Sequence, residues 1–284
     1  MTLEQGRAGS IATLADKNFK EMNIGIAVST YTEEKTEPER YEIIDRSLKS
    51  LKKIMENTKN IHVVIVVDGE VPNRHNDILE KYVGEFAIHR RSRNGGVART
   101  KNTSIRLLLE KGVDIGFLAD DDVLYRDGCI RKYCETIARG RIHHMGFSQM
   151  HPTVHPEEEW RKFGYVKENL NGQDVMRHGG GGVGCWLSFT PELIEKIGYF
   201  KVMTGKYGYE HINFSKRCMH HGMIPYCCDI TNPFEYIDHI GFEPVGHNKF
   251  KKSHSISEEV RVAENNKNKN EWKADFDKYV CPVE

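Results

Sequence analysis

The chain of 284 residues has no apolar run close to the roughly 20 residues that a helix needs to cross a bilayer. Its first 20 residues are polar and carry no apolar signal core, so we expect a cytoplasmic protein without a membrane span. Excess charge is also missing, because 41 Lys and Arg residues balance 41 Asp and Glu residues. This balance argues against a protein that holds polyanions by its overall field, although a local basic groove stays possible.

The seven cysteines lack the spacing of a metal site. They are scattered without a Cys-x-x-Cys pair, and Cys227 and Cys228 are adjacent. Reduced and mostly buried thiols are therefore expected. A hydrophobic content of 38% and a charged content of 29% indicate a soluble globular protein with one large domain or two small ones.

The first half of the chain alternates apolar runs with helical patterns. The runs predict strands at residues 24–28, 61–67, 86–89 and 115–119. Helical spacing predicts helices at residues 37–55, 77–82, 97–111 and 128–139. This alternation is typical of an α/β protein built from βαβ units with a parallel sheet. Ligands bind such sheets at the edge where the carboxyl ends of the strands meet.

The second half is less regular. Strands are expected at residues 145–150, 183–189 and 224–230, and helices at residues 191–197 and 209–221. A polar stretch of roughly 30 residues, which includes four glycines at 179–182, precedes the strand at 183–189. A loop of this length is usually functional or mobile.

The strongest chemical signal is an acidic triplet after an apolar strand. Asp120, Asp121 and Asp122 directly follow the run that ends at Ala119. Three adjacent carboxylates repel one another, and Mg²⁺ or Mn²⁺ would compensate them while keeping positions for phosphate oxygens. The alternative is a solvated acidic turn, which the preceding strand disfavours.

A glycine-containing basic segment is the second signal. Asn94, Gly95 and Gly96 precede a predicted helix that carries Arg99 and Lys101 in its first turns. Glycines allow close backbone approach at a helix N-terminus, where free N–H groups favour an anion such as a phosphate. A capped helix with a solvated basic face explains the segment equally well on its own.

Polar side chains also follow the first two predicted strands. Thr30, Tyr31 and Glu33 lie after the first strand, and Asp68 lies after the second. These groups could hold a nucleoside at the edge of the sheet. Taken alone, ordinary turn chemistry is the better explanation of Asp68 and Gly69.

In this order, the three segments resemble the nucleotide-sugar half of GT-A glycosyltransferases, and in particular glycosyltransferase family 2. That family has a Thr-Tyr-Asn-Glu-like turn after its first strand, which residues 29–33 match with Thr32 in place of Asn. Its Asp after the second strand, which contacts the base, corresponds to Asp68. Its Asn-x-Gly-x-x-x-Ala-Arg-Asn-like segment is close to residues 94–102, although Thr100 follows the arginine.

A DxD motif completes the resemblance, and residues 120–122 satisfy it. The match covers residues 22–128 and implies a GT-A (Rossmann-like), mainly parallel sheet flanked by helices, with a smaller acceptor-side C-terminal portion. It also implies a nucleoside-diphosphate sugar as donor, expected to be a UDP-sugar. The donor contacts it implies are Thr30, Tyr31, Glu33, Asp68, Asn94, Gly95, Arg99, Asp120 and Asp121.

The resemblance further implies bound Mn²⁺ or Mg²⁺. We expect Asp122 to hold the metal, with Asp120 as second choice, because the register of the triplet is open by one residue. Relatives often add a histidine from the C-terminal region as a ligand. His247 is preferred over His239, because it follows a glycine-containing loop and precedes a lysine cluster.

Two later segments resemble the acceptor side of these enzymes. Gly181 and Gly182 would leave room for a sugar, and Trp186 is a candidate platform for it. Residues 207–213 resemble a Gly-x-Glu-Asp-x-Asp segment whose Asp acts as general base, but His211 stands at that position beside Glu210. Three interpretations stay open: His211 as base, Glu210 as base (which we favour), or a retaining mechanism without such a base.

These assignments divide the chain into four parts. They are an N-terminal arm (1–21), a nucleotide-sugar-binding part (22–128), an acceptor-binding and catalytic part of the same domain (129–250), and a polar tail (251–284) with a weak helix near 272–279.

The expected reaction is metal-dependent transfer of a sugar to a hydroxyl of a saccharide, or of a hydroxymethylated DNA base as in some viral enzymes. Arg90, Arg91, Arg93 and the lysines at 249–252 are candidate contacts to DNA phosphates. A sugar nucleotidyltransferase is disfavoured, because residues 29–35 contain no glycine. A non-catalytic binding module would not need both the acidic triplet and the glycine-rich loop.

Overall fold

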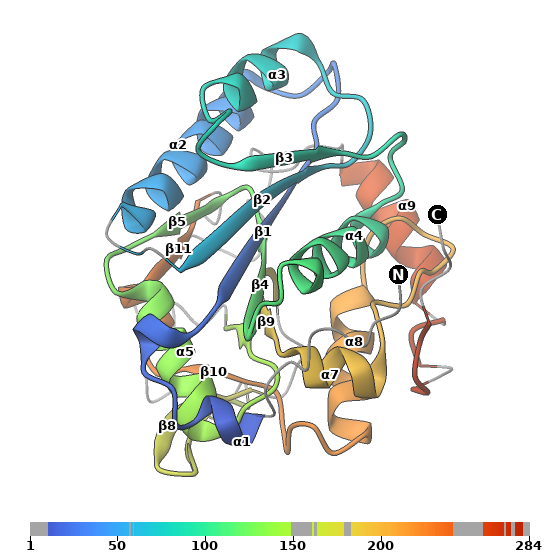
Figure 1. Ribbon diagram of the computed structural model, residues 1–284. Coiled ribbons are helices and arrows are strands. Elements are labelled where there is room, and N and C mark those ends of the chain that lie inside the picture. Colours follow the sequence, from blue (N-terminus) through green and yellow to red (C-terminus); the bar gives the residue numbers. More distant parts are fainter. Residues whose placement is uncertain are drawn as a thin grey trace.

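The centre of the protein is a six-stranded sheet in the order β3-β2-β1-β4-β9-β6 (Figure 1). The computed structural model describes residues 11–56, 58, 60–148, 161, 164–178, 183–240, 258–269, 271–273 and 276–280. The strands of this sheet are β1 (Ile24–Thr30), β2 (Ile61–Val67), β3 (Ala87–Arg90), β4 (Ile115–Asp120), β6 (Gly146–Phe147) and β9 (Val183–Phe189).

Four neighbouring strands of the sheet are parallel. β1 pairs with β2 on one side and with β4 on the other, and β2 pairs with β3. The register sets Thr30 opposite Val67 and Ser29 opposite Asp120, so these strands end at one edge. β9 runs antiparallel to β4 and joins the second half of the chain to the same sheet. The prediction of a mainly parallel α/β fold is confirmed.

Helices cover both faces of this sheet. They are α2 (Pro38–Met55), α3 (Asn73–Glu80), α4 (Val97–Glu110), α5 (Cys129–Gly140), α7 (Pro191–Ile197) and α8 (Glu210–His220). α2 buries Ile44 and Leu48, and α4 packs beside β1 with Ile105 and Leu108 buried. α2 and α4 lie on opposite sides of β1 (Figure 1). Burial on both faces explains why the parallel strands have nearly continuous apolar sequences.

The polar stretch before β9 contains a hairpin that the sequence analysis did not predict. β7 (Val166–Leu170) pairs antiparallel with β8 (Gln173–Arg177), and β10 (Cys228–Ile230) adds to β8. Asn171 and Gly172 form the turn, with φ values of 51° and 83°. Asn-Gly is the preferred pair in two-residue hairpins, because both positions need positive φ. This dipeptide was the signal that could have revealed the hairpin.

A separate two-stranded sheet joins distant parts of the sequence. β5 (Val123–Tyr125) pairs antiparallel with β11 (Ile237–His239), which follows the short helix η4 (Pro233–Glu235). Each strand has only three residues, which is too short for a periodic signal. In the register, His239 stands opposite Val123, directly after the acidic triplet.

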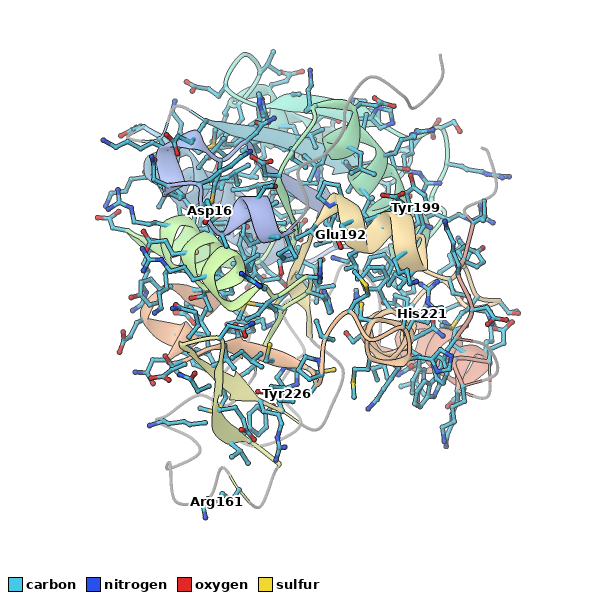
Figure 2. All side chains as sticks on the ribbon, turned by 60° about the horizontal axis from the view of Figure 1, so that its bottom comes forward. Asp16, Arg161, Glu192, Tyr199, His221 and Tyr226 are labelled. Carbon is cyan, nitrogen blue, oxygen red and sulfur yellow. The ribbon has the colours of Figure 1, made fainter. Side chains whose placement is uncertain are left out.

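The described part of the N-terminal arm packs against the domain. It forms α1 (Ile11–Leu14) and η2 (Phe19–Glu21), and Leu14 is buried. Ile11 N–H donates to Glu192 of α7 (3.0 Å), and Lys17 pairs with Asp114 (2.8 Å). Figure 2 marks Glu192 near the chain of this arm.

The expected helix near residues 272–279 is wrong, because the C-terminal helix α9 spans Glu258–Asn268. Tyr279 instead forms a backbone bridge to Gly198, and its N–H donates to the carbonyl of Ile197 (3.0 Å). This pairing requires extended backbone, which a helix does not have. Among the described residues, six cysteines are free and buried, and none of the helices is long and apolar enough to span a membrane.

Candidate active site

At the end of β2, the second predicted strand, Asp68 forms an ion pair with Arg91. The Asp68 carboxylate accepts hydrogen bonds from the Arg91 guanidinium, from Gly95 N–H (3.0 Å) and from Gly96 N–H (2.9 Å). Val97 N–H donates to the carbonyl of Lys206 (3.0 Å). The amides of Gly95 and Gly96, which precede α4, and of Val97, its first residue, are thus occupied by protein acceptors, which leaves fewer amides for a phosphate than the sequence pattern predicts.

Asp121 is buried rather than facing a donor. It is 3% exposed, and its two oxygens accept hydrogen bonds from Arg40 of α2 and from the hydroxyl of Thr30. Thr30 also lies 3.1 Å from His75. Burial raises the pKa of Asp121, and Arg40 partly offsets this. Both residues were predicted to contact the donor, but their polar atoms here hold β1, α2 and the triplet together.

Asp120 is paired with a lysine that the sequence analysis placed beside a phosphate. Lys101 is fully buried, and its Nζ lies 2.8 Å from Asp120 Oδ1 and 2.9 Å from the carbonyl of Gly184. The Asp120 side chain is 37% exposed. Lys101 therefore neutralises the first carboxylate of the triplet and ties it to β9, while leaving one side of Asp120 open.

Asp122 lies beside the histidine that β11 delivers. Its Oδ1 is 3.2 Å from His239 Nε2, and its Oδ2 is 4.0 Å from Arg40 Nη1. Burial opposes protonation of His239, but the Asp122 carboxylate raises the pKa of the imidazole above its ordinary value. A proton on His239 therefore offsets the charge of Asp122, and it would have to leave before the imidazole could bind a metal. His247, our first choice as ligand, lies outside the described residues.

A divalent metal fits this donor set. In the described part of the chain, no three metal-type side chains are grouped closely enough to enclose an ion. Mg²⁺ and similar hard ions need only one or two protein carboxylates when substrate phosphates and water complete the shell. The carboxylate of Asp122 and the imidazole of His239, with the exposed side of Asp120 nearby, are suitable ligand types for Mn²⁺ or Mg²⁺.

The two predicted catalytic side chains form a pair at the start of α8. Glu210 is 4% exposed, and its Oε1 lies 3.0 Å from His211 Nε2. Burial opposes ionisation of Glu210, but the contact with His211 holds the pKa of the carboxyl below its usual range, with Lys101 contributing. His211 Nδ1 has no hydrogen-bond partner among the described residues.

Gly184 explains how this pair approaches β9. A Cβ atom at Gly184 would lie only 2.0 Å from His211 Nε2, so no larger residue is compatible with this packing. The same residue's carbonyl accepts from Lys101. The strand after the glycine-rich loop therefore connects Asp120 and Lys101 with the Glu210–His211 pair.

Trp186 is a core residue, not a platform for a sugar. It is 1% exposed and stacks on Phe117 with ring centroids 4.6 Å apart, and the rings of Tyr125 and Tyr133 meet it edge-on. Trp186 lies on the inward face of β9, where it stands opposite Ala119 of the neighbouring strand β4. Gly181 and Gly182 lie outside the described residues.

Tyr207 is a site residue that the sequence analysis missed. Its hydroxyl contacts the side chain of Asn94, and burial raises its pKa to about 12, with the nearby Asp68, Tyr31 and Glu33 adding to the rise. Four predicted donor contacts thus lie near a tyrosine from the second half of the chain. Tyr207 begins the acceptor-side segment 207–213, but its place beside the donor segment was not predictable, because the two approach each other only through tertiary contacts.

The arginines predicted to contact DNA phosphates differ in their exposure to solvent. Arg91 is buried against Asp68, so it is not free to bind DNA phosphates, whereas Arg90 and Arg93 are exposed. Arg99 is half-buried beside Gly95, where a Cβ atom would come within 2.7 Å of Arg99 Cδ. The lysines at 249–252 lie outside the described residues.

Comparison with known proteins now identifies the class. Residues 26–198 match the family described as glycosyl transferase family 2. An uncharacterized glycosyltransferase of Acanthamoeba polyphaga mimivirus is 38% identical over 264 residues, which cover 93% of this chain and 96% of that protein. The chain belongs to glycosyltransferase family 2, as its motifs predict, and is therefore an enzyme of the glycosyltransferase class.

Solved structures agree on the GT-A fold. The mannosyltransferase PcManGT from Pyrobaculum calidifontis, in complex with GDP-Man and Mn²⁺, has a TM-score of 0.55 at 14% identity. S. aureus TarS in complex with UDP-GlcNAc has a TM-score of 0.51 at 15% identity. The matches cover 83% and 86% of this chain, but the chain spans only 60% and 64% of those two proteins.

Proposed function

We propose that the protein transfers a sugar from a nucleoside-diphosphate sugar, with UDP as the expected nucleotide, to an acceptor hydroxyl with the help of Mn²⁺ or Mg²⁺. The observation that carries this proposal is the meeting of Asp122 with His239 at the edge of the sheet, beside the half-open Asp120. Support for the donor class comes from the fold neighbours, whose structures are complexes with GDP-Man and Mn²⁺ or with UDP-GlcNAc.

Asp122 and His239 would hold the metal, and Asp120 would face the sugar-bearing part of the donor. When bound, the metal would neutralise charge that develops on the departing nucleoside diphosphate. Lys101 keeps Asp120 in one orientation, and Tyr207, Tyr31 and Asn94 would line the nucleoside end. Residues 22–128 would thus form most of the donor site, and residues 129–250 most of the acceptor site.

For the acceptor, the geometry favours His211 as the proton acceptor and Glu210 as the carboxylate that orients it. Glu210 Oε1 lies 3.0 Å from His211 Nε2, which fixes the proton of a neutral imidazole on Nε2. Nδ1, which has no partner among the described residues, would then take the proton of an attacking hydroxyl; because this atom is buried, the acceptor must displace the groups that cover it. This assignment differs from the favoured sequence interpretation, in which Glu210 itself is the base.

The acceptor class is proposed to be a saccharide. Use of Arg91 in an internal ion pair weakens the case for a duplex DNA acceptor, because it removes one of the three neighbouring arginines from the surface. A hydroxymethylated base in duplex DNA is kept as the second acceptor in the experiment below.

The test is a donor screen. The protein is incubated with UDP-, GDP- and other nucleotide sugars with and without Mn²⁺, and the released nucleotide is measured. Free nucleoside diphosphate that depends on metal supports the proposal, whereas release of pyrophosphate or no release contradicts it. Saccharides and hydroxymethylated duplex DNA are then offered with the preferred donor, and the labelled product identifies the acceptor.

A further inference from the structure

Asn268, in the tail that the sequence analysis treated as polar and unassigned, is almost fully buried. It ends α9 and is 1% exposed. Its side-chain amide donates to the carbonyls of Gly205 (3.1 Å), Tyr207 (3.1 Å) and Gly208 (2.9 Å), while its Oδ1 accepts from Gly205 N–H (2.7 Å). One side chain thus contacts four backbone groups of a single loop, residues 204–208, with its two N–H donors shared among three carbonyls.

Other C-terminal contacts support the same loop from the same side. Lys206 N–H donates to Glu264 (2.7 Å), and Thr204 N–H donates to Glu271 (2.9 Å). The ring of Trp272 stacks on Tyr209, with centroids 5.9 Å apart. Figure 2 shows α8, marked by His221 at its end, alongside the C-terminal helix.

The opposite side of this loop contacts the donor half of the site. The carbonyl of Lys206 accepts from Val97 N–H at the start of α4, and a Cβ atom at Gly96 would lie 2.5 Å from that carbonyl oxygen. Tyr207 contacts Asn94 and lies near Asp68, Tyr31 and Glu33. The loop 204–208 therefore connects α9, which holds it through Asn268, with the proposed nucleoside end of the site.

Asn268 is suited to this role because its four hydrogen bonds are with backbone groups. Hydrogen bonds to backbone groups fix the path of the loop independently of its side chains. Without the Asn268 amide, the loop carbonyls that now accept its hydrogen bonds would be buried and unsatisfied. Residues 204 and 206 are exposed, so apolar burial contributes little to holding these positions. Loss of Asn268 is therefore expected to loosen the loop locally rather than to unfold the sheet.

We propose that Asn268 is a positioning residue for donor binding: by holding residues 204–208, it keeps Tyr207 against the nucleoside end of the donor site. This inference rests on the proposed function, since it assigns the region around Tyr207, Asn94 and Asp68 to the nucleotide. It also makes the C-terminal helix a structural part of the active site.

The experiment compares Asn268→Ala with Asn266→Ala in the full chain. Asn266 is an exposed residue of the same helix and serves as the matched control. Affinity for UDP and GDP is measured by calorimetry, the donor KM and kcat are measured separately, and amide exchange is followed at residues 204–209. Tyr207→Ala is included because its side chain can be removed without disturbing α9.

Asn268→Ala is expected to weaken nucleotide binding and raise the donor KM by on the order of tenfold, with kcat at saturating donor nearly unchanged. Exchange at residues 204–209 should become faster, and Asn266→Ala should resemble the wild type. Tyr207→Ala should weaken binding similarly, and the double variant should be no weaker than either single one.

Two results would overturn the inference. One is normal nucleotide affinity and donor KM in a folded Asn268→Ala protein; the other is normal affinity in Tyr207→Ala. A wild-type protein that binds no nucleotide and hydrolyses no donor would overturn the proposed function and this inference together, whereas the first two results would overturn the inference alone.

Discussion

The proposed donor and acceptor halves of the site neutralise their carboxylates differently. In the donor half, Asp68, Asp120 and Asp121 are paired with Arg91, Lys101 and Arg40 respectively. In the acceptor half, Glu210 is paired with an imidazole, and Asp229 is held by neutral donors: Tyr133 hydroxyl (2.7 Å), Ser148 N–H (2.7 Å) and Ile230 N–H (2.8 Å).

The difference indicates which groups are fixed and which can change protonation. Arginine and lysine carry fixed positive charges, whereas a histidine, or a carboxyl held only by neutral donors, can change protonation near neutral pH. Despite burial, His211 holds the pKa of Glu210 below its usual range, and burial raises the pKa of Asp229 to about 7. The donor half is therefore suited to holding charge, and the acceptor half to moving protons. Asp122 differs from its neighbours, since its Oδ1 lies 3.2 Å from the imidazole of His239.

The largest effect is expected for Asp122→Ala. Removing this carboxylate should abolish transfer, because the proposed metal would lose its main ligand, while the fold stays intact. The measurements are the transfer activity of the variant with Mn²⁺ and its circular dichroism, which reports whether the fold is intact. Glu39→Ala, at an exposed position in the first turn of α2, serves as control and should retain activity. Transfer that survives both Asp122→Ala and metal chelation would contradict the proposed role of this half.

The second prediction separates His211 from Glu210. His211→Gln should lower kcat by about 10²–10⁴-fold, the usual contribution of a general base. Glu210→Gln should lower it less, because the imidazole would remain but lose its orienting carboxylate. The decisive measurement is kcat against pH: the acid limb should disappear in His211→Gln and persist in Glu210→Gln. The reverse pattern would make Glu210 the base.

The third prediction concerns the pH dependence of stability. Burial raises the pKa of Asp229 to about 7, so between roughly pH 4 and 7 the folded protein keeps a proton that the unfolded chain has lost. This group therefore stabilises the protein at low pH, and its contribution falls as pH rises to about 7. Asp229→Asn should flatten this slope in urea titrations across that range. Asp77→Asn, at an exposed position on α3, should leave it unchanged.

The fourth prediction tests whether the acceptor half uses Trp186. Trp186→Phe should lower the free energy of unfolding by on the order of 2 kcal/mol, because it opens space beside Phe117 and Tyr133. The acceptor KM should not change, since the ring is buried. A raised acceptor KM at unchanged stability would instead indicate a sugar platform.

The smallest effect on stability is expected for Lys101→Met. Because Asp120 is 37% exposed and can be hydrated, the cost should be about 1 kcal/mol, below that of breaking a fully buried pair. The donor KM should rise as Asp120 loses its fixed orientation. Lys111→Met, at the exposed end of the same helix, is the control for urea unfolding and kinetics.

Local sequence predicted the parallel sheet and the order of the donor motifs well. Continuous β-branched runs such as residues 61–67 define buried strands, and each motif is contiguous in sequence. The partners of the carboxylates were not predictable, because Arg40, Arg91 and Lys101 reach them from other elements. The same limit applied to Trp186, whose burial depends on β4 and β9 being neighbours, and to His239, which is positioned by two three-residue strands.

The pairing of β5 with β11 has a consequence for protein synthesis. The four parallel strands come from the first half of the chain and can associate while the rest is still being made, since nearby segments meet first. His239 reaches Asp122 only after β11 has emerged from the ribosome. An incomplete chain can therefore build much of the sheet without the proposed metal site, so the proposed reaction would begin only once β11 has been made.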